Sequence, residues 1–259
     1  MSGPQKDLRW PVRIHTLGRF AVILRDKPLF IGSQVQTKPL ELLRKLIALG
    51  GRGVAVDKLA QELRPNTTEK AAKHALETTL YRLRKLLGDR CVEMKSGCLT
   101  IDADYCWVDI WSVEQLFDTA EQRTSPVIQM KELFELYQGP FLESDDAPYV
   151  LIQRERLHSK FLRAVGQIGG ALLSSGEHER AIECYQRGIE ADPMAEELYR
   201  CLMRCFYELG RSAEAMAVYW RCQKTLTCIL GVEPSIQTEM LYQEIQGQSK
   251  RPGLATPTG

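Results

Sequence analysis

Residues 68–88 read TEKAAKHALETTLYRLRKLLG. Apolar side chains recur in this stretch at steps of three or four residues, which places them on one face of a helix over Thr68–Leu87. They are Ala72, Leu76, Leu80, Leu83 and Leu87. The other faces are cationic, with hydrogen-bonding and aromatic side chains between the charges. Such a helix either docks on a core and reads DNA in the major groove or is an ordinary solvated surface helix, and the surrounding sequence decides between the two.

The formal net charge of +1 conceals two halves of opposite sign. Residues 1–105 contain 19 Lys and Arg against 11 Asp and Glu, whereas residues 106–259 contain 15 against 22. The first half therefore carries +8 and the second −7. This imbalance indicates a first half that binds a polyanion and a second half that prefers protein partners.

The chain shows no sign of membrane insertion or export. No run of about 18 apolar residues occurs, and the N-terminus lacks the apolar core of a signal peptide. We therefore expect a cytoplasmic protein without a membrane partner. Its eight cysteines are then expected to be free thiols, and the absence of a Cys-x-x-Cys pair gives a zinc or thioredoxin-like site little support.

Short strands and two helices are predicted ahead of the basic helix. The strands are expected at Val12–Gly18, Phe20–Leu24 and Leu29–Ile31, with a turn over residues 25–28 before the last strand. A largely buried helix is expected to open near Thr37 and to stop at Gly50. These elements would form a small sheet and the first helix of a bundle.

A second short helix is predicted over Val56–Leu63. Asn66 and Glu69 then have the spacing of a capping box, which would open the basic helix, and Gly88 would end it.

Two brief strands are predicted after the basic helix, at Cys91–Met94 and Cys98–Ile101. Residues 95–97 join them and place Lys95 at the tip of a hairpin. Such a hairpin suits a wing that rests on a phosphate backbone, and a plain edge ribbon is the alternative. The order of helix, turn, helix, basic helix and hairpin predicts a winged helix-turn-helix.

This order of elements resembles the DNA-binding domain of the response-regulator type. The segment Tyr81–Gly88, YRLRKLLG, is similar to the end of that family's recognition helix. No receiver domain precedes it in this sequence, so aspartyl phosphorylation is not expected as the input.

The second half contains an internal repeat with a period of 34 residues. Four positions recur at this offset: Gly176, Ala181, Tyr185 and Arg187 reappear as Gly210, Ala215, Tyr219 and Arg221. The period is that of a tetratricopeptide-like helical hairpin. In such a hairpin, glycine allows the turn, alanine allows the helices to approach and tyrosine fills a groove. Residues Asp109–Leu136 and Pro148–Ser174 are also predicted to be helical.

A winged helix followed by such repeats resembles the bacterial transcriptional activators known as antibiotic regulatory proteins, whose C-terminal part is called the bacterial transcriptional activation domain. The resemblance covers about Val12–Gln246. The most similar stretches are Lys38–Leu43, Cys106–Trp111, Tyr137–Leu142 and Glu196–Ala217. It implies a mainly α fold with a DNA-binding domain over residues 12–105 and a helical domain over 106–246, and we expect a disordered tail over 247–259.

The resemblance also implies a function and partners. Members of the family bind direct repeats in promoter DNA, often side by side, and contact RNA polymerase. We therefore expect double-stranded DNA, RNA polymerase and a second copy of the chain on DNA as partners. An adaptor built on the helical repeats and a repressor of the same architecture are the alternatives.

The candidate DNA-binding residues lie on the basic helix and the hairpin. Arg82 and Arg84 can pair with guanine or clamp a phosphate. His74, Thr78 and Tyr81 are candidates for contact with base edges. Glu77 could repel a phosphate, accept from a cytosine amine or pair with Lys73 or Arg84, and the pairing is favoured. The candidates for phosphate contact are Lys70, Lys73, Lys85 and Lys95.

No catalytic or metal-binding motif emerges from the sequence. The histidines at positions 15, 158 and 178 have no ligand-spaced partners, so we expect no enzyme activity, no cofactor and no metal. Cys201 and Cys205, one turn apart, and the nearby Cys222 and Cys228 are interpreted as small apolar fillers of the repeat core. A redox or metal sensor is the alternative for these thiols.

Overall fold

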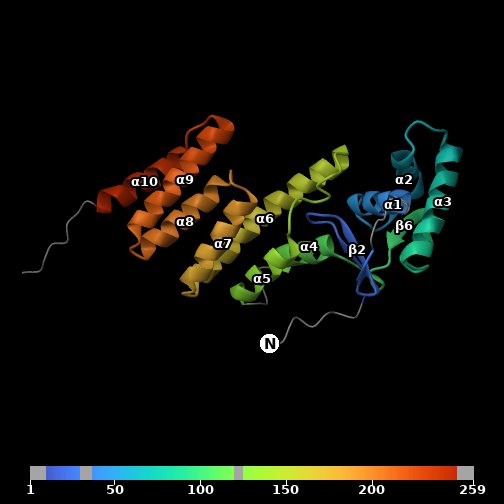
Figure 1. Ribbon diagram of the computed structural model, residues 1–259, viewed down its shortest axis with the longest axis horizontal. Coiled ribbons are helices and arrows are strands. Elements are labelled where there is room, and N and C mark those ends of the chain that lie inside the picture. The colour runs from blue at the N-terminus through green and yellow to red at the C-terminus, as the bar shows by residue number, and fades with distance from the viewer. Residues whose placement is uncertain (1–9, 30–36, 120–124, 250–259) are drawn as a thin grey trace, which may run out of the picture. The chain divides into compact units, whose positions relative to one another are not determined.

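The computed structural model describes residues 10–29, 37–119 and 125–249. The chain divides into two compact units, the first formed by residues 1–115 and 135–158 and the second by residues 116–134 and 159–259. Figure 1 shows strands and helices together in the N-terminal part of the chain and helices after them. The expected fold class is confirmed: a winged helix-turn-helix with a small sheet, followed by an all-α helical repeat.

The first sheet has the strand order β3-β2-β1-β7. Its strands are β1 (Val12–His15), β2 (Ala21–Leu24), β3 (Lys27–Pro28) and β7 (Cys106–Val108). Neighbouring strands are antiparallel except β1 and β7, which run parallel with Val12 opposite Cys106. The sequence prediction missed β7, because a three-residue strand has too few positions to show an alternating pattern.

The turn between β2 and β3 is tighter than expected. Arg25 and Asp26 have positive φ angles of 49° and 62°, so they make the two-residue turn that matches the twist of a hairpin. The strand predicted at Leu29–Ile31 was wrong in position, because this short turn lets pairing resume at Lys27. Residues 30 and 31 lie outside the described part of the chain.

Three helices form the core of the first unit. They are α1 (Thr37–Ala48), α2 (Val56–Leu63) and α3 (Glu69–Leu87), and they pack against one another. The N-cap of α3 is Thr68, whose hydroxyl accepts from the amide of Ala71 at 3.4 Å. The capping box predicted at Asn66 was therefore wrong, because Thr68 supplies the oxygen three residues before that amide.

The hairpin after α3 belongs to a second sheet with the order β4-β6-β5. Its strands are β4 (Val54–Ala55), β5 (Val92–Lys95) and β6 (Cys98–Ile101). The turn of the hairpin contains Ser96 and Gly97, which both have positive φ. Strand β4, which the sequence prediction missed, pairs with β6 immediately before α2 begins. The hairpin is therefore part of the helical bundle and not a detached ribbon.

Beyond the sheets, the first unit contains the start of α4 (Asp109–Thr119), the last two residues of α5 (Pro126–Leu136) and the start of α6 (Pro148–Ser174). The segment between α5 and α6 lies against β1: Leu17 bridges to Phe141, and the amide of Leu142 donates to the carbonyl of Thr16 at 2.8 Å. Arg154 fixes this segment by donating to the carbonyls of Phe141 and Leu142 at 2.9 and 2.7 Å.

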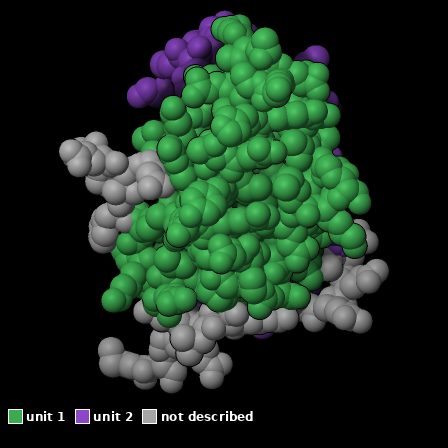
Figure 2. All heavy atoms as spheres, turned by 90° about the vertical axis from the view of Figure 1, so that its right-hand side faces the viewer, with its two compact units in different colours: residues 1–115, 135–158 green, residues 116–134, 159–259 purple. Residues whose placement is uncertain are grey.

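The observed division into units differs from a boundary after residue 105. Strand β7 completes the first sheet, and residues 135–158 belong to the same compact unit as residues 1–115 (Figure 2). The two stretches are distant in sequence, so periodicity within either of them gives no sign of this association.

The second unit contains the predicted helical hairpins. After α6 come α7 (His178–Ala191), α8 (Glu196–Glu208), α9 (Ser212–Leu230) and α10 (Ile236–Ser249). Gly176 and Gly210, 34 residues apart, both have positive φ, and each lies in a turn with the same pair of closing hydrogen bonds. This hydrogen-bond pattern is the Schellman motif. Ala181 and Ala215 are both fully buried, as the close approach of two helices requires.

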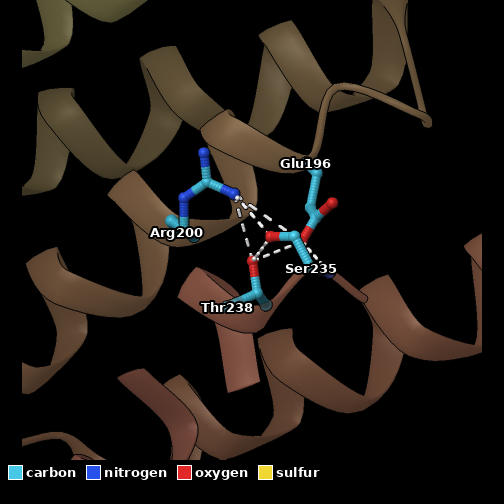
Figure 3. A network of polar contacts seen from close by, with 4 residues as sticks. All are labelled: Glu196, Arg200, Ser235 and Thr238. Carbon is cyan, nitrogen blue, oxygen red and sulfur yellow. Dashed lines mark hydrogen bonds and ion pairs between the residues drawn. The ribbon is translucent and has the colours of Figure 1, made fainter. Parts of the chain in front are cut away.

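A polar network joins α8 to the start of α10 (Figure 3). One carboxylate oxygen of Glu196 accepts from the amide and hydroxyl of Ser235, at 2.7 and 2.6 Å, and from the hydroxyl of Thr238. Arg200 lies 3.6 Å from the same oxygen. The carboxylate therefore satisfies donors at the N-terminus of α10.

The disordered tail predicted over residues 247–259 begins too early. Helix α10 continues to Ser249, and residues 250–259 lie outside the described part of the chain. In the part that is described, no helix has both the length and the apolar character that crossing a lipid bilayer requires.

Candidate nucleic-acid interface

Helix α3 has one buried and one exposed face, as its sequence predicts. The five apolar positions predicted for the core are all buried, and the most exposed of them, Leu80, has only 3% of its surface accessible. The opposite face presents a stripe of exposed side chains at helical spacing. It consists of Lys70, His74, Glu77, Thr78, Tyr81, Arg82 and Lys85. The apolar face anchors the helix, so the stripe is held in a fixed orientation.

Lys73 is not a free cation. It donates to Asp57 on α2 at 2.7 Å and to Glu69 on its own helix at 2.8 Å. These hydrogen bonds raise the pKa of Lys73, and the bond to Asp57 has the larger effect. The expected pairing of Glu77 with Lys73 or Arg84 was wrong. The neighbour of Glu77 is instead His74, whose Nδ1 lies 4.0 Å from the Glu77 carboxylate.

Arg84 is directed at the hairpin. Its Nε and Nη2 both donate to the carbonyl of Val92, at 3.0 and 2.7 Å. The side chain is partly buried, unlike that of Arg82, which is exposed. The two arginines were predicted to play similar parts, and the structure gives them different surroundings.

Exposed cations remain on both the helix and the hairpin. Lys70, Arg82 and Lys95 are exposed and form no ion pair within the described part of the chain. Lys85 Nζ lies 5.4 Å from the centre of the Tyr81 ring, and this tyrosine is 61% exposed. A cation over an aromatic ring at this distance stabilises both side chains modestly.

Thr78 lies within the exposed stripe. Its hydroxyl donates to the carbonyl of His74 at 3.0 Å, which leaves the oxygen lone pairs and the methyl group available. A hydroxyl oxygen can accept from a base amine, and a methyl group can contact the methyl group of thymine. His74, Thr78, Tyr81 and Arg82 therefore offer different chemistry to a groove from one face.

The hairpin contacts both α2 and α3 directly. The amide of Val56, the first residue of α2, donates to the carbonyl of Gly97 at 2.9 Å, and Arg84 holds the carbonyl of Val92 on the outer strand. Lys95 lies at the end of β5 beside the turn. Its backbone is therefore fixed relative to both α2 and α3.

Two partners of the candidate residues were not found from the sequence. Asp57 neutralises Lys73 from another helix, and the carbonyl of Val92 receives Arg84. Spacing within α3 contains no signal for either contact, because both partners lie outside that helix. Met94, beside Lys95 on β5, is a further exposed side chain at 51% that the prediction did not single out.

The eight cysteines are free thiols in the structure. Burial raises the pKa of Cys205 to about 11 and that of Cys184 and Cys222 to about 12. A raised pKa keeps a thiol protonated and unreactive, which agrees with apolar fillers at Cys205 and Cys222. The same interpretation was wrong for Cys228, which is exposed at the end of α9. Among the described side chains, no three His, Cys, Asp or Glu gather as a metal ion would require.

Comparison with protein families identifies the larger part of the chain. Residues 108–246 match the family described as the bacterial transcriptional activator domain. Regulatory protein AfsR of Streptomyces griseus is 29% identical over 210 residues, which are 79% of this chain and 22% of that protein. Transcriptional regulator RedD of Streptomyces coelicolor is 25% identical over 231 residues, 84% of this chain and 65% of that protein.

A solved structure has the same fold. Mycobacterium tuberculosis EmbR, determined in complex with a low affinity phosphopeptide, superimposes with a TM-score of 0.65 at 20% sequence identity. The match covers 92% of this chain and 65% of EmbR. The chain thus spans about a fifth of the length of AfsR and about two thirds of RedD and EmbR.

Proposed function

The chain belongs to the family of the bacterial transcriptional activator domain, and from this we propose that it activates transcription by binding promoter DNA in a sequence-specific manner. Its relatives AfsR and RedD are a regulatory protein and a transcriptional regulator, which agrees with the expectation that the chain is not an enzyme. The family places the chain among transcriptional regulators, and the remaining steps of the proposal come from the winged helix.

The observation that carries the proposal is the exposed stripe of α3, held over a buried leucine face and beside a hairpin with a free lysine. B-form DNA admits a helix into its major groove. With α3 in the groove, Arg82 meets base edges together with His74, Thr78 and Tyr81. Lys70, Lys85 and Lys95 contact phosphates, which position the protein without reading sequence.

The helical repeat unit supplies the protein contacts in this proposal. Over residues 116–134 and 159–259 it carries 13 Lys and Arg against 15 Asp and Glu, and a unit without a positive excess suits a protein partner better than nucleic acid. We assign to it contact with RNA polymerase, and we assign to two copies of the chain the binding of direct repeats side by side.

Selection of bound sequences from a random pool of DNA duplexes tests the proposal. The purified full chain is compared with Arg82→Ala and with Arg221→Ala, a matched control that removes an exposed arginine from α9 in the other unit. We expect the wild type and Arg221→Ala to enrich one repeated motif and Arg82→Ala to lose it. The distance between the repeats would give the spacing of the two bound copies.

Absence of enrichment by the wild type would contradict the proposal. The repeat unit would then be the working part of the chain, as in a protein-interaction adaptor. Equal enrichment by wild type and Arg82→Ala would instead show that α3 is not the reading element.

A further inference from the structure

Arg84 connects two parts of the interface that must contact DNA at the same time. It lies in the last turn of α3, and its side chain reaches the carbonyl of Val92 at the start of β5. The contact uses Nε and Nη2, at 3.0 and 2.7 Å, on a single oxygen. A guanidinium presents its donors in a rigid planar fork, so this contact fixes direction as well as distance.

Strand β5 depends on such a contact more than β6 does. It is one of the two outer strands of the sheet β4-β6-β5 and pairs only with β6, whereas β6 is paired on both edges. The bond between Val56 and Gly97 restrains the turn from the side of α2. Arg84 supplies the restraint from α3. The carbonyl that it holds is three residues before Lys95, which corresponds to roughly 10 Å of extended strand.

We propose that Arg84 is a positioning residue that sets the hairpin relative to α3, so that Lys95 meets a phosphate while Arg82 meets the bases. The inference rests on the proposed function and refines it. Of the two arginines two residues apart, Arg82 contacts DNA, and Arg84 acts on DNA through Lys95. Arg84 was predicted to contact DNA itself. Because its Nε and Nη2 already donate to the carbonyl of Val92, the indirect role is favoured.

A double-mutant cycle between Arg84 and Lys95 separates the two roles, because contacts that act as a unit give effects that are not additive. The full-length variants are Arg84→Lys, Lys95→Ala and the combination, measured on the selected duplex over a range of salt concentrations. Arg84→Lys keeps the charge and loses the fork. Log affinity falls as log salt concentration rises, and loss of one phosphate contact lowers the magnitude of this slope by about 1.

We expect Lys95→Ala and Arg84→Lys each to lower that slope by about 1, and the combination to lower it by no more than either alone. The matched control is Arg82→Lys, the same chemical change on the exposed arginine. In a chain that carries Arg82→Lys, the further change Lys95→Ala should still lower the slope by about 1. Amide exchange of residues 92–95 in the free protein should accelerate in Arg84→Lys and not in Arg82→Lys.

Fold-losses that multiply in the combined variant would overturn the inference and show that Arg84 contacts DNA directly. If Lys95→Ala alone left both the affinity and its salt dependence unchanged, the inference would also be overturned. Should Arg84→Lys fail to fold, Arg84→Gln, which keeps one donor for the carbonyl, takes its place in the cycle. Failure of the wild type to enrich any sequence refutes the proposed function itself, which distinguishes that outcome from failure of this inference alone.

Discussion

Asp109 is a buried carboxylate at the first position of α4, and only 1% of its surface is accessible. It accepts from the amide and hydroxyl of Thr16, both at 2.6 Å, and from the amide of Leu17 at 2.9 Å. Burial raises the pKa of this carboxyl, and the donors of Thr16 and Leu17 oppose the rise. The residue therefore fastens the start of α4 to the end of β1.

Replacing Asp109 by asparagine should destabilise the first unit. The asparagine side chain has one acceptor oxygen where the carboxylate has two. Its NH2 group therefore faces at least one of the donors of Thr16 and Leu17, so a buried hydrogen bond is lost and a polar group is left unsatisfied. We expect the free energy of unfolding to fall by about 3 kcal/mol, measured by urea denaturation. Asp104→Asn, at an exposed position nearby, is the control and should change it little. Equal effects of the two variants would contradict this role.

Single residues show where the sequence is informative. The leucines of α3 were predicted correctly because burial follows the helical period. The parts played by Lys73 and Arg84 were not predicted, because their partners, Asp57 and the carbonyl of Val92, lie on other elements. Identity and spacing on one helix indicate which side chains can reach DNA, and tertiary contacts decide which are free to do so.

Gly88 ends α3 in a conformation that suits only glycine, with φ of 113° and ψ of 149°. A β-carbon built there would lie 2.2 Å from the hydroxyl of Tyr105, which itself donates to the carbonyl of Leu87 at 3.1 Å. The glycine therefore allows the chain to leave the helix and the tyrosine to cover its end.

Substitution of Gly88 by alanine should therefore cost more than backbone strain alone, which is about 1–3 kcal/mol at such a conformation. Gly50→Ala is the matched control, since Gly50 has a similar φ of 107° but no atom within 4 Å of an added β-carbon. We expect the Gly88 variant to melt at the lower temperature. A Gly50 variant that is equally or more destabilised would refute the role given to Tyr105.

Glu196 stabilises the junction of α8 and α10 through its charged form. Burial alone would raise its pKa, but the hydrogen bonds from Ser235 and Thr238 hold the pKa of Glu196 below the ordinary 4.5. A lowered pKa in the folded state means that this stabilisation is complete above pH 4.5 and is lost as the pH falls below it. The repeat unit should therefore become less stable in acid.

Glu196→Gln should lower the free energy of unfolding at pH 7 by about 2 kcal/mol and should weaken its dependence on pH below 4.5. Denaturant titrations at pH 7, 5 and 3.5 measure both effects. Glu197→Gln, on the exposed neighbouring residue, is the control. If the two variants showed the same pH profile, the network would not be the source of the dependence.

Helices were predicted better than strands. The bounds of α2 and α6 agree with the predicted Val56–Leu63 and Pro148–Ser174, and the 34-residue repeat was confirmed because each hairpin repeats the same local turn. Strands β4 and β7 were missed, because two or three residues carry no periodic signal and owe their pairing to neighbours distant in sequence.

The first unit is assembled from two separate stretches of chain, and this limits where it can be cut. A fragment of residues 1–105 lacks β7, the Asp109 carboxylate and Phe141, which is fully buried. A fragment of residues 1–158 retains all three. We expect the shorter fragment to lose cooperative thermal unfolding and the longer one to keep it, as followed by circular dichroism. Cooperative unfolding of residues 1–105 at the temperature of the longer fragment would contradict this account.

The central claim is that α3 reads bases through Arg82 and that the surrounding lysines only position the protein. The most direct measurement is the ratio of affinities for the selected and a scrambled duplex at one salt concentration, for the wild type, Arg82→Ala and Lys70→Ala. We predict that Lys70→Ala weakens both affinities and leaves the ratio unchanged, whereas Arg82→Ala lowers the ratio by about tenfold or more. An unchanged ratio in Arg82→Ala would contradict the claim.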